Sequence, residues 1–187
     1  MKSGLKLSLF GAALSVGLIP TTVQAQLEGS TLAWQYFAYG GAYTGANDFV
    51  VQPGILGNFL GYFNIEADNT SITFDYSSYT GSDVWSPSGL SLAPTIYNGI
   101  AIDVISGPTI TSVSIDSATN MAGFNLSDLS FTGNQIQVNW ADLPFDGSTI
   151  VKLDVNSSTS TTPAPPACFA ALATAGLAAA RRRFKKA

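Results

Sequence analysis

Short runs of alternating apolar and polar residues recur through residues 26–155, and they predict strands for this part of the chain. In Gln135–Trp140, the apolar Ile136, Val138 and Trp140 alternate with Gln and Asn, so one face of the run is apolar. A period of two residues is typical of a half-buried strand. The other predicted strands are Leu32–Tyr36, Tyr62–Glu66, Ser71–Tyr76, Gly99–Ile105, Thr109–Ile115, Leu129–Phe131 and Thr149–Val155.

Turn-forming residues separate these runs. Gly107-Pro108 lies between two predicted strands, Asp68-Asn69 precedes another, and Thr132-Gly133-Asn134 is a gap of hairpin length. No window shows a helical apolar period beyond two turns. The nearest case, Gly54–Leu60, could form a short helix after Pro53, although its two glycines argue against one. Short strands at regular spacing with Gly-rich turns predict an all-β domain, either a β-sandwich or a jelly roll, whose strand order stays open.

The charges of the 187-residue chain are segregated by sign. All twelve acidic residues, from Glu28 to Asp154, lie in the middle, where Lys152 is the one base, so residues 26–162 carry a net charge of −11. A domain this acidic repels phosphate backbones, which argues against nucleic-acid binding. The chain has no His, and its one cysteine, Cys168, lies in a C-terminal apolar run. Ser–His and Cys–His nucleophile pairs and His-ligated metal sites are therefore excluded.

Residues 1–25 have the parts of a secretory signal peptide, whose apolar segment would be helical. Lys2 and Lys6 form the positive start, Leu7–Ile19 is largely apolar, and Val23-Gln24-Ala25 offers small or permissive residues at the cleavage positions. We expect cleavage after Ala25. The alternative is a retained N-terminal anchor, for which the apolar run is short.

Two segments follow the predicted domain at residues 26–155. Residues 156–166 predict a linker, because they combine a Ser/Thr-rich run with a stiff proline-rich exit. Residues 167–187 predict a hydrophobic helix followed by a basic end; the uncharged stretch Ala167–Ala180 would span about 21 Å as a helix, against a hydrocarbon core of about 30 Å. Membrane insertion would be marginal. The basic end should stay cytoplasmic, which places the domain on the outer side.

The C-terminal tail resembles the PEP-CTERM sorting signal of exported proteins from Gram-negative bacteria, often bacteria that make extracellular polysaccharide. The resemblance lies in Pro163-Ala164-Pro165, the short apolar helix and the run Arg181-Arg182-Arg183, with Ala164 where the family usually has Glu. It implies recognition at the inner membrane by an exosortase-type transpeptidase, cleavage near the proline motif, and release to the cell surface or extracellular matrix. The alternative is a plain C-terminal transmembrane anchor with a basic stop.

Carboxylates are the catalytic groups that the middle of the chain offers in number. Two of them could serve a glycoside hydrolase, but no spacing in the sequence brings a pair together, so no catalytic residue is assigned and no enzyme is expected. A structural calcium could be held by the loops at residues 142–147 or 66–69, although neither has the EF-hand spacing, and no cofactor is otherwise expected. The candidate acids are Glu28, Glu66, Asp68, Asp75, Asp83, Asp103 and Asp142.

Aromatic residues in Gly-rich loops are the candidate sugar contacts. Tyr39 and Tyr43 lie in one such loop, and Tyr79 and Trp85 flank another, Gly81-Ser82-Asp83. Rings on exposed loops can stack on sugar rings, and neighbouring Asn and Asp can bind hydroxyls. The alternative is that loop tyrosines pack beside a core formed by Trp34, Tyr36, Tyr62, Tyr76 and Trp140.

Two functions stay open after these exclusions. The first is an exported surface or matrix-associated structural protein, sorted by its tail and without a small-molecule site. The second is a module that binds extracellular polysaccharide through the candidate aromatic residues. A carboxylate-based glycoside hydrolase is a third and weaker alternative.

Overall fold

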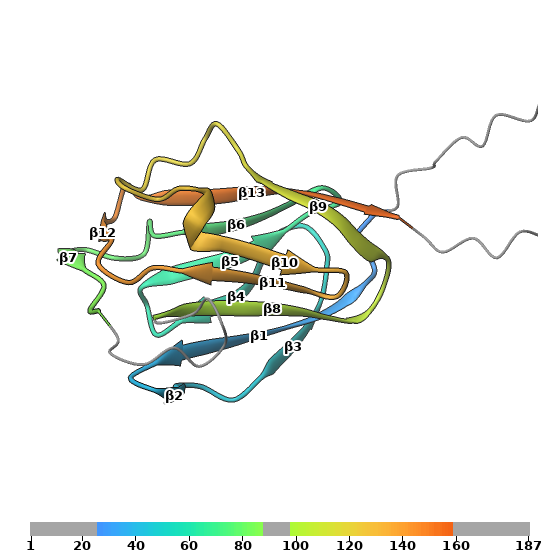
Figure 1. Ribbon diagram of the computed structural model, residues 1–187, viewed down its shortest axis with the longest axis horizontal. Helices are drawn as coiled ribbons and strands as arrows, with labels where there is room; N and C mark the ends of the chain where they lie inside the picture. The colour runs from blue at the N-terminus through green and yellow to red at the C-terminus, as the bar shows by residue number, and fades with distance from the viewer. Residues whose placement is uncertain (1–25, 88–97, 159–187) are drawn as a thin grey trace, which may run out of the picture.

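The computed structural model describes residues 26–87 and 98–158, which form two antiparallel β-sheets packed face to face (Figure 1). This all-β arrangement is consistent with a β-sandwich. The predicted signal peptide, its predicted cleavage position Ala25, the predicted sorting motif and the C-terminal tail lie outside the described residues. No helix within the described ranges is long and apolar enough to cross a bilayer.

The first sheet is built around β1, which pairs with β8 on one side and with β2 and β3 on the other. The order of hydrogen-bonded strands in this sheet is β10-β11-β8-β1-β2. Strand β3 also pairs with β1, on the same side as β2. The strands are β1 (Thr31–Ala38), β2 (Gly41–Ala42), β3 (Asn47–Val50), β8 (Gly99–Ser106), β10 (Leu129–Thr132) and β11 (Gln135–Asn139).

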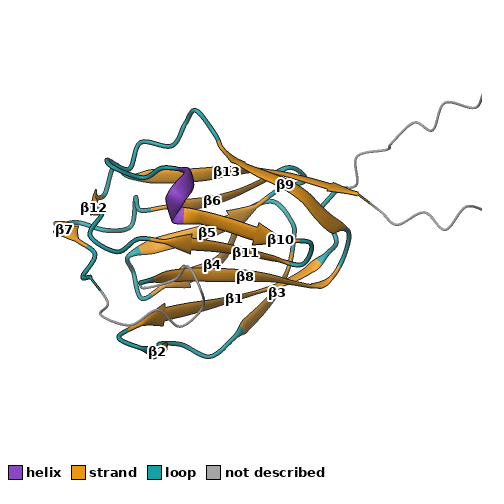
Figure 2. Ribbon diagram, in the orientation of Figure 1, coloured by secondary structure: helices purple, strands orange, loops and turns teal. Residues whose placement is uncertain are grey.

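The second sheet has the order β4-β5-β6-β13-β9. A separate short ribbon pairs β12 with β7, and a turn of 3₁₀-helix, η1, leads into β10 (Figure 2). Asn125 caps η1 with a hydrogen bond to the Ser127 amide. These elements are β4 (Ile55–Phe59), β5 (Phe63–Ala67), β6 (Ser71–Asp75), β7 (Ser82–Val84), β9 (Thr109–Ile115), η1 (Leu126–Asp128), β12 (Pro144–Asp146) and β13 (Ile150–Ser158).

The core lies between the sheets and follows the alternation of the sequence. Every strand predicted from that alternation is present, and the predicted hairpin connects β10 and β11. On β1 the inward residues Leu32, Trp34 and Tyr36 are buried, as are Ile136 and Val138 on β11. Burial of these side chains removes apolar area from water and is the main stabilising term for such a domain.

The structure decides one alternative that the sequence leaves open and shifts one expected boundary. Gly54–Leu60 contains strand β4 rather than a short helix. Gly57 suits this strand because a Cβ there would lie 2.7 Å from Trp34 Nε1, so the close approach of the indole requires a glycine. Residues 156–158, assigned to the linker, continue β13, where Ser157 is buried opposite Ile110 of β9.

The two ends of the domain carry different loops. We call "pocket end" the end formed by turns 38–44 and 59–62, segment 76–86 and strand β12, on the left in Figure 1. We call "opposite end" the one formed by turns 68–70, 106–109 and 132–135. Leu27 donates to the Asn69 carbonyl, and Ser158 pairs with Thr109, so both limits of the described domain lie at the opposite end.

Candidate functional site

A cavity of about 280 Å³ opens at the pocket end. Its floor is formed by Tyr36, Phe59 and Trp85, which come from β1, β4 and the residue after β7. Its rim is formed by Tyr39, Tyr43, Leu60, Asp83 and Val84. This volume lies just below the roughly 300–1,000 Å³ typical of small-molecule pockets, which suits a ligand group of ring size.

The floor is a rigid aromatic cluster. The Tyr36 and Phe59 rings are stacked, with centroids 3.8 Å apart, and the Trp85 ring stacks on Phe145 with centroids 4.6 Å apart. Trp85 is 8% exposed, and its indole N–H donates to the Tyr76 hydroxyl over 3.2 Å. Trp85 is therefore packed into the floor of the cavity rather than projecting into solvent.

The rim exposes large apolar side chains that could be buried by a ligand. Tyr39 is 71% exposed, Tyr43 53%, Leu60 65% and Val84 55%. The Tyr39 and Tyr43 rings lie 6.3 Å apart, and Tyr43 contacts Phe59 edge-on. Exposed apolar side chains that gather around a concave site are typical of binding surfaces.

Two of these rim residues occupy backbone positions that L-residues disfavour. Tyr39 has φ 53° and the following Gly40 φ 84°; Leu60 has φ 51° and the following Gly61 φ 80°. Both pairs are the central residues of tight turns whose geometry favours Asn-Gly. A left-handed conformation costs a residue such as Tyr or Leu about 1–2 kcal/mol. The rim therefore carries bulky side chains at two positions where the backbone conformation is unfavourable for them. Backbone strain of this kind clusters at functional sites.

A chain of hydrogen bonds holds the Tyr39 ring in place. The Tyr36 hydroxyl donates to Asn98 Oδ1 over 2.7 Å, Asn98 Nδ2 donates to the Ser86 carbonyl over 2.8 Å, and Ser86 Oγ donates to the Tyr39 hydroxyl over 3.1 Å. Asn98 is only 2% exposed, so its amide is a fixed link in this chain. Such support orients the rim ring before any ligand arrives.

Asp83 supplies the charge of the pocket. Its Oδ1 accepts from the Val84 amide over 2.8 Å, and the side chain is exposed at the rim. Burial and the Asp83 carboxylate raise the pKa of the neighbouring Tyr79 hydroxyl. Burial likewise raises the pKa of Tyr36. Both hydroxyls therefore remain neutral hydrogen-bonding groups at physiological pH.

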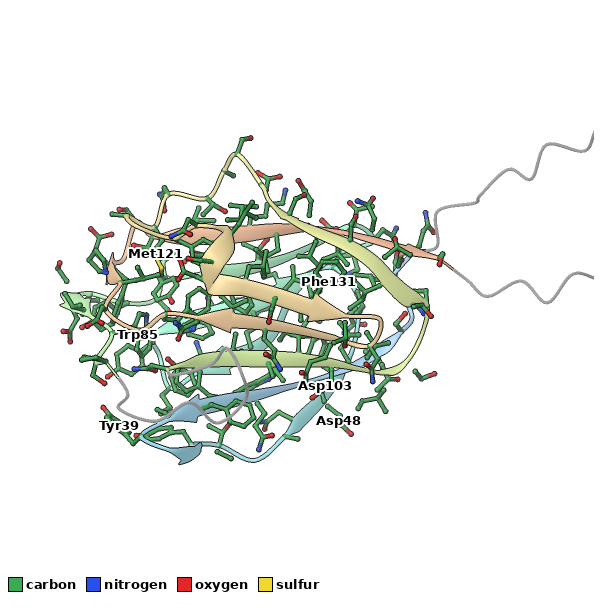
Figure 3. The ribbon with its side chains drawn as sticks, in the orientation of Figure 1. Tyr39, Asp48, Trp85, Asp103, Met121 and Phe131 are labelled. Carbon is green, nitrogen blue, oxygen red and sulfur yellow. The ribbon has the colours of Figure 1, made fainter. Side chains whose placement is uncertain are left out.

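The structure brings three of the four predicted sugar contacts together. Tyr39, Tyr43 and Trp85 all line the cavity, and Figure 3 shows Tyr39 and Trp85 toward the same end, away from Phe131. Tyr79 does not line it; its ring stacks on Tyr62 with centroids 5.5 Å apart, beside Asp83. Sequence reasoning missed Leu60, Ser86 and Asn98 as pocket residues, and assigned Tyr62 to the core. Leu60 had a usable signal, since a residue before Gly in a hairpin turn is often exposed.

The predicted calcium loops use their carboxylates for local hydrogen bonds. Asp68 accepts from the Thr70 amide, the Ser71 amide and Ser71 Oγ. Burial alone would raise the pKa of Asp68, but these hydrogen bonds lower it below the ordinary value of 3.8. Asp146 accepts from the Ser148 amide and hydroxyl. No group of three His, Cys, Asp or Glu side chains within the described ranges could hold a metal ion.

The carboxylates predicted as candidate acids are dispersed rather than paired in the cavity. Asp83 is the one acid among the described residues that line it. Asp103 accepts from Gln135 Nε2 on the first sheet, and Asp75 accepts from the Ser77 amide. Asp116, which was not singled out, forms an ion pair with Lys152 at 3.6 Å. Glu66 and Asp68 do line a second cavity, of about 240 Å³, in which Asp68 accepts from the Thr70 and Ser71 amides. The cavity at the pocket end therefore lacks a carboxylate pair among its described residues.

No protein-family model, curated protein or solved structure matches this chain. A function must therefore be inferred from the geometry and chemistry of the pocket.

Proposed function

We propose that this protein is an exported surface protein whose β domain binds extracellular polysaccharide in the cavity at the pocket end. The observation that carries the proposal is the convergence on one cavity of Tyr39 and Tyr43, from one loop, and Trp85, from another. Two of these rings are exposed at its rim, and the third closes its floor.

The pocket combines the two kinds of contact that a sugar offers. A sugar ring has apolar C–H faces that pack on aromatic rings, and hydroxyls that need hydrogen-bond partners. Tyr39 and Tyr43 supply exposed ring faces, while Asp83, Ser86 and the Tyr39 hydroxyl supply polar groups within the same cavity. Because the chain from Tyr36 through Asn98 holds Tyr39 in place, little order has to be gained on binding.

The position of the pocket relative to the chain ends also supports a surface protein. Both limits of the described domain lie at the end opposite the pocket. A tail that follows Ser158 and holds the protein at a membrane would therefore leave the pocket facing outward. The positive-inside rule gives the same orientation, because it keeps the two basic termini on the cytoplasmic side and leaves the acidic domain outside.

For the termini we propose export by the signal peptide and sorting by an exosortase-type transpeptidase. The support is the three-part tail that resembles PEP-CTERM signals, with Pro163-Ala164-Pro165 before the apolar stretch. Mass spectrometry of the mature protein tests this directly. The expected N-terminus is Gln26 and the expected C-terminus lies near Pro163; an intact Ala187 would instead indicate a retained transmembrane anchor.

Retention of the full-length chain on immobilised polysaccharides tests the binding function. The chain should be solubilised in a detergent without a sugar headgroup, and the panel should include cellulose, xylan, chitin, chitosan and alginate. Wild type should be retained by at least one of them, and the double variant Tyr39→Ala/Tyr43→Ala should lose that retention. Phe131→Ala removes an exposed ring outside the pocket and should leave it unchanged.

If wild type binds no polysaccharide in the panel, the pocket function is wrong. The protein would then be a structural or matrix-associated surface component, in which the aromatic cluster serves packing alone. Release of reducing sugar from a retained polysaccharide would instead point to the hydrolase alternative.

A further inference from the structure

The one charged side chain among the described residues that line the pocket is negative. Asp83 is exposed at its rim, and no basic side chain of the described residues lines the cavity. The domain's one base, Lys152, lies on β13 and pairs with Asp116 at 3.6 Å. A charged ligand that enters the pocket therefore meets a carboxylate without a counter-charge.

The remaining walls are also suited to positive charge. A cation within about 6 Å of the centroid of a tyrosine ring is attracted by the negative face of the ring. The Tyr39 and Tyr43 rings pack against each other with centroids 6.3 Å apart, so a cation on the cavity side of this pair can lie within that range of both rings. Both rings and Asp83 line the same cavity.

A metal ion does not match this combination of groups. Calcium takes six to eight oxygen ligands and prefers several carboxylates, whereas Asp83 is the one carboxylate of the described lining, beside the neutral polar groups of Ser86, Asn98 and the tyrosines. An organic ammonium fits better, since it hydrogen-bonds to a carboxylate and tolerates contact with aromatic rings.

The field of the whole domain favours the same sign of ligand. Twelve acidic residues against Lys152 give residues 26–162 a net charge of −11. A domain with this charge repels uronate polymers and attracts polycations, and the effect weakens as salt is added.

We propose that the pocket selects amino sugars with a free ammonium group, so that its preferred polysaccharide is of the de-N-acetylated glucosamine type. This inference rests on the polysaccharide-binding function proposed above and adds the class of sugar. Asp83 pairs with the ammonium group, and Tyr39 and Tyr43 contact the ring that carries it.

Calorimetric titration of the full-length chain with three defined hexamers tests this selectivity. The probes are hexamers of glucosamine, N-acetylglucosamine and guluronate, each at low salt and again at high salt. Glucosamine should bind at least about tenfold more tightly than its N-acetylated form, and guluronate should not bind. Asp83→Asn should bring the two glucosamine forms to equal affinity, and Asp83→Glu should restore part of the preference.

Asp48→Asn is the matched control, because it makes the same change in net charge at an exposed residue of β3 outside the pocket. If Asp48→Asn lowers the preference as much as Asp83→Asn, the selectivity comes from overall charge and the pocket assignment fails. Equal affinity of wild type for the two glucosamine forms would overturn the selectivity and leave polysaccharide binding in place. Failure of all three hexamers, together with no retention on the polysaccharide panel, would overturn both.

Discussion

The turns that connect strands at the two ends of this domain are built from different residues. At the opposite end, turns use polar residues that satisfy their own backbone: Asp68 accepts from two amides and a hydroxyl, and Asn69 bonds to Glu28. At the pocket end, Tyr39 and Leu60 occupy left-handed positions and expose most of their side chains. Asp146 makes a polar turn of the same kind at the pocket end, so the difference lies in Tyr39 and Leu60. At these two positions the pocket end gives up stability to expose large side chains beside the cavity.

The largest expected effect concerns backbone packing beside the pocket. Gly99 opens β8 opposite Asn139, and a Cβ there would clash with the Val138 carbonyl oxygen. Because the contact is with backbone, no rotamer change relieves it, and Gly99→Ala should lower the free energy of unfolding by at least about 3 kcal/mol. Gly133→Ala at the opposite end brings a Cβ to 3.0 Å from a Thr109 methyl carbon and should cost less than about 1 kcal/mol. Urea unfolding measures the free energy of unfolding of both variants. Equal losses in the two variants would mean that the backbone is packed equally tightly at Gly99 and Gly133.

The next effect tests the polar turn at the opposite end. Asp68→Ala removes the acceptor of three hydrogen bonds and should lower the free energy of unfolding by about 1–2 kcal/mol at neutral pH. Because the pKa of Asp68 is lowered in the fold, its ionised form stabilises the protein above the ordinary value of 3.8. The difference between wild type and variant should therefore shrink as the pH falls below that value. Asp48→Ala is the control; an equal loss there would remove the special role of Asp68.

A gain in stability is expected at the pocket end. Leu60→Asn and Tyr39→Asn would create Asn-Gly pairs in turns of the geometry that favours them, so each should relieve about 1 kcal/mol of backbone strain. Leu60→Asn should raise the midpoint of thermal unfolding by about 2–6 °C, and Tyr39→Asn by less, because it also loses the bond from Ser86. Tyr39→Asn should at the same time weaken polysaccharide retention. If both variants were less stable than wild type, the proposal that these positions favour binding at the expense of stability would be contradicted.

The smallest expected effect concerns Asp154 on β13 and the neighbouring Asp116, which follows β9. Burial raises the pKa of Asp154, and so does the nearby negative charge of Asp116. The ionised form is therefore disfavoured in the fold, and Asp154→Asn should slightly raise the unfolding temperature at pH 7 but not below pH 3.8. Asp116→Asn should act in the opposite direction, since a hydrogen bond from the Ala118 amide and the charge of Lys152 lower the pKa of Asp116. Thermal unfolding of both variants at two pH values checks the signs, and identical signs would contradict this assignment.

Most of the longer strands and much of the core could be predicted from the sequence, because an apolar residue at every second position is a local signal. The inward residues of β1 and β11 could be named in advance on that basis. Strands β2, β3, β7 and β12 could not, since their two to four residues lack the apolar alternation that the equally short β10 has. The order of the strands was also beyond reach, because pairing depends on contacts distant in the chain.

The site was predictable only in part, for the same reason. Tyr39, Tyr43 and Trp85 stood out because glycines mark the loops that carry them. The link from Tyr36 to Asn98 joins residues that are 62 positions apart, and nothing in the local sequence marks it. The strain at Leu60 likewise becomes visible only with backbone angles.

Hydroxyl-radical footprinting of the full-length chain, with and without glucosamine hexamer, tests most directly whether the pocket end binds sugar. Mass spectrometry reads the oxidation of each aromatic side chain, so the result needs no variant. We expect strong protection of Tyr39 and Tyr43 by the hexamer, and no change at Phe131, which is exposed outside the cavity. Equal oxidation of Tyr39 and Tyr43 in both samples, or protection centred on Phe131, would contradict the account.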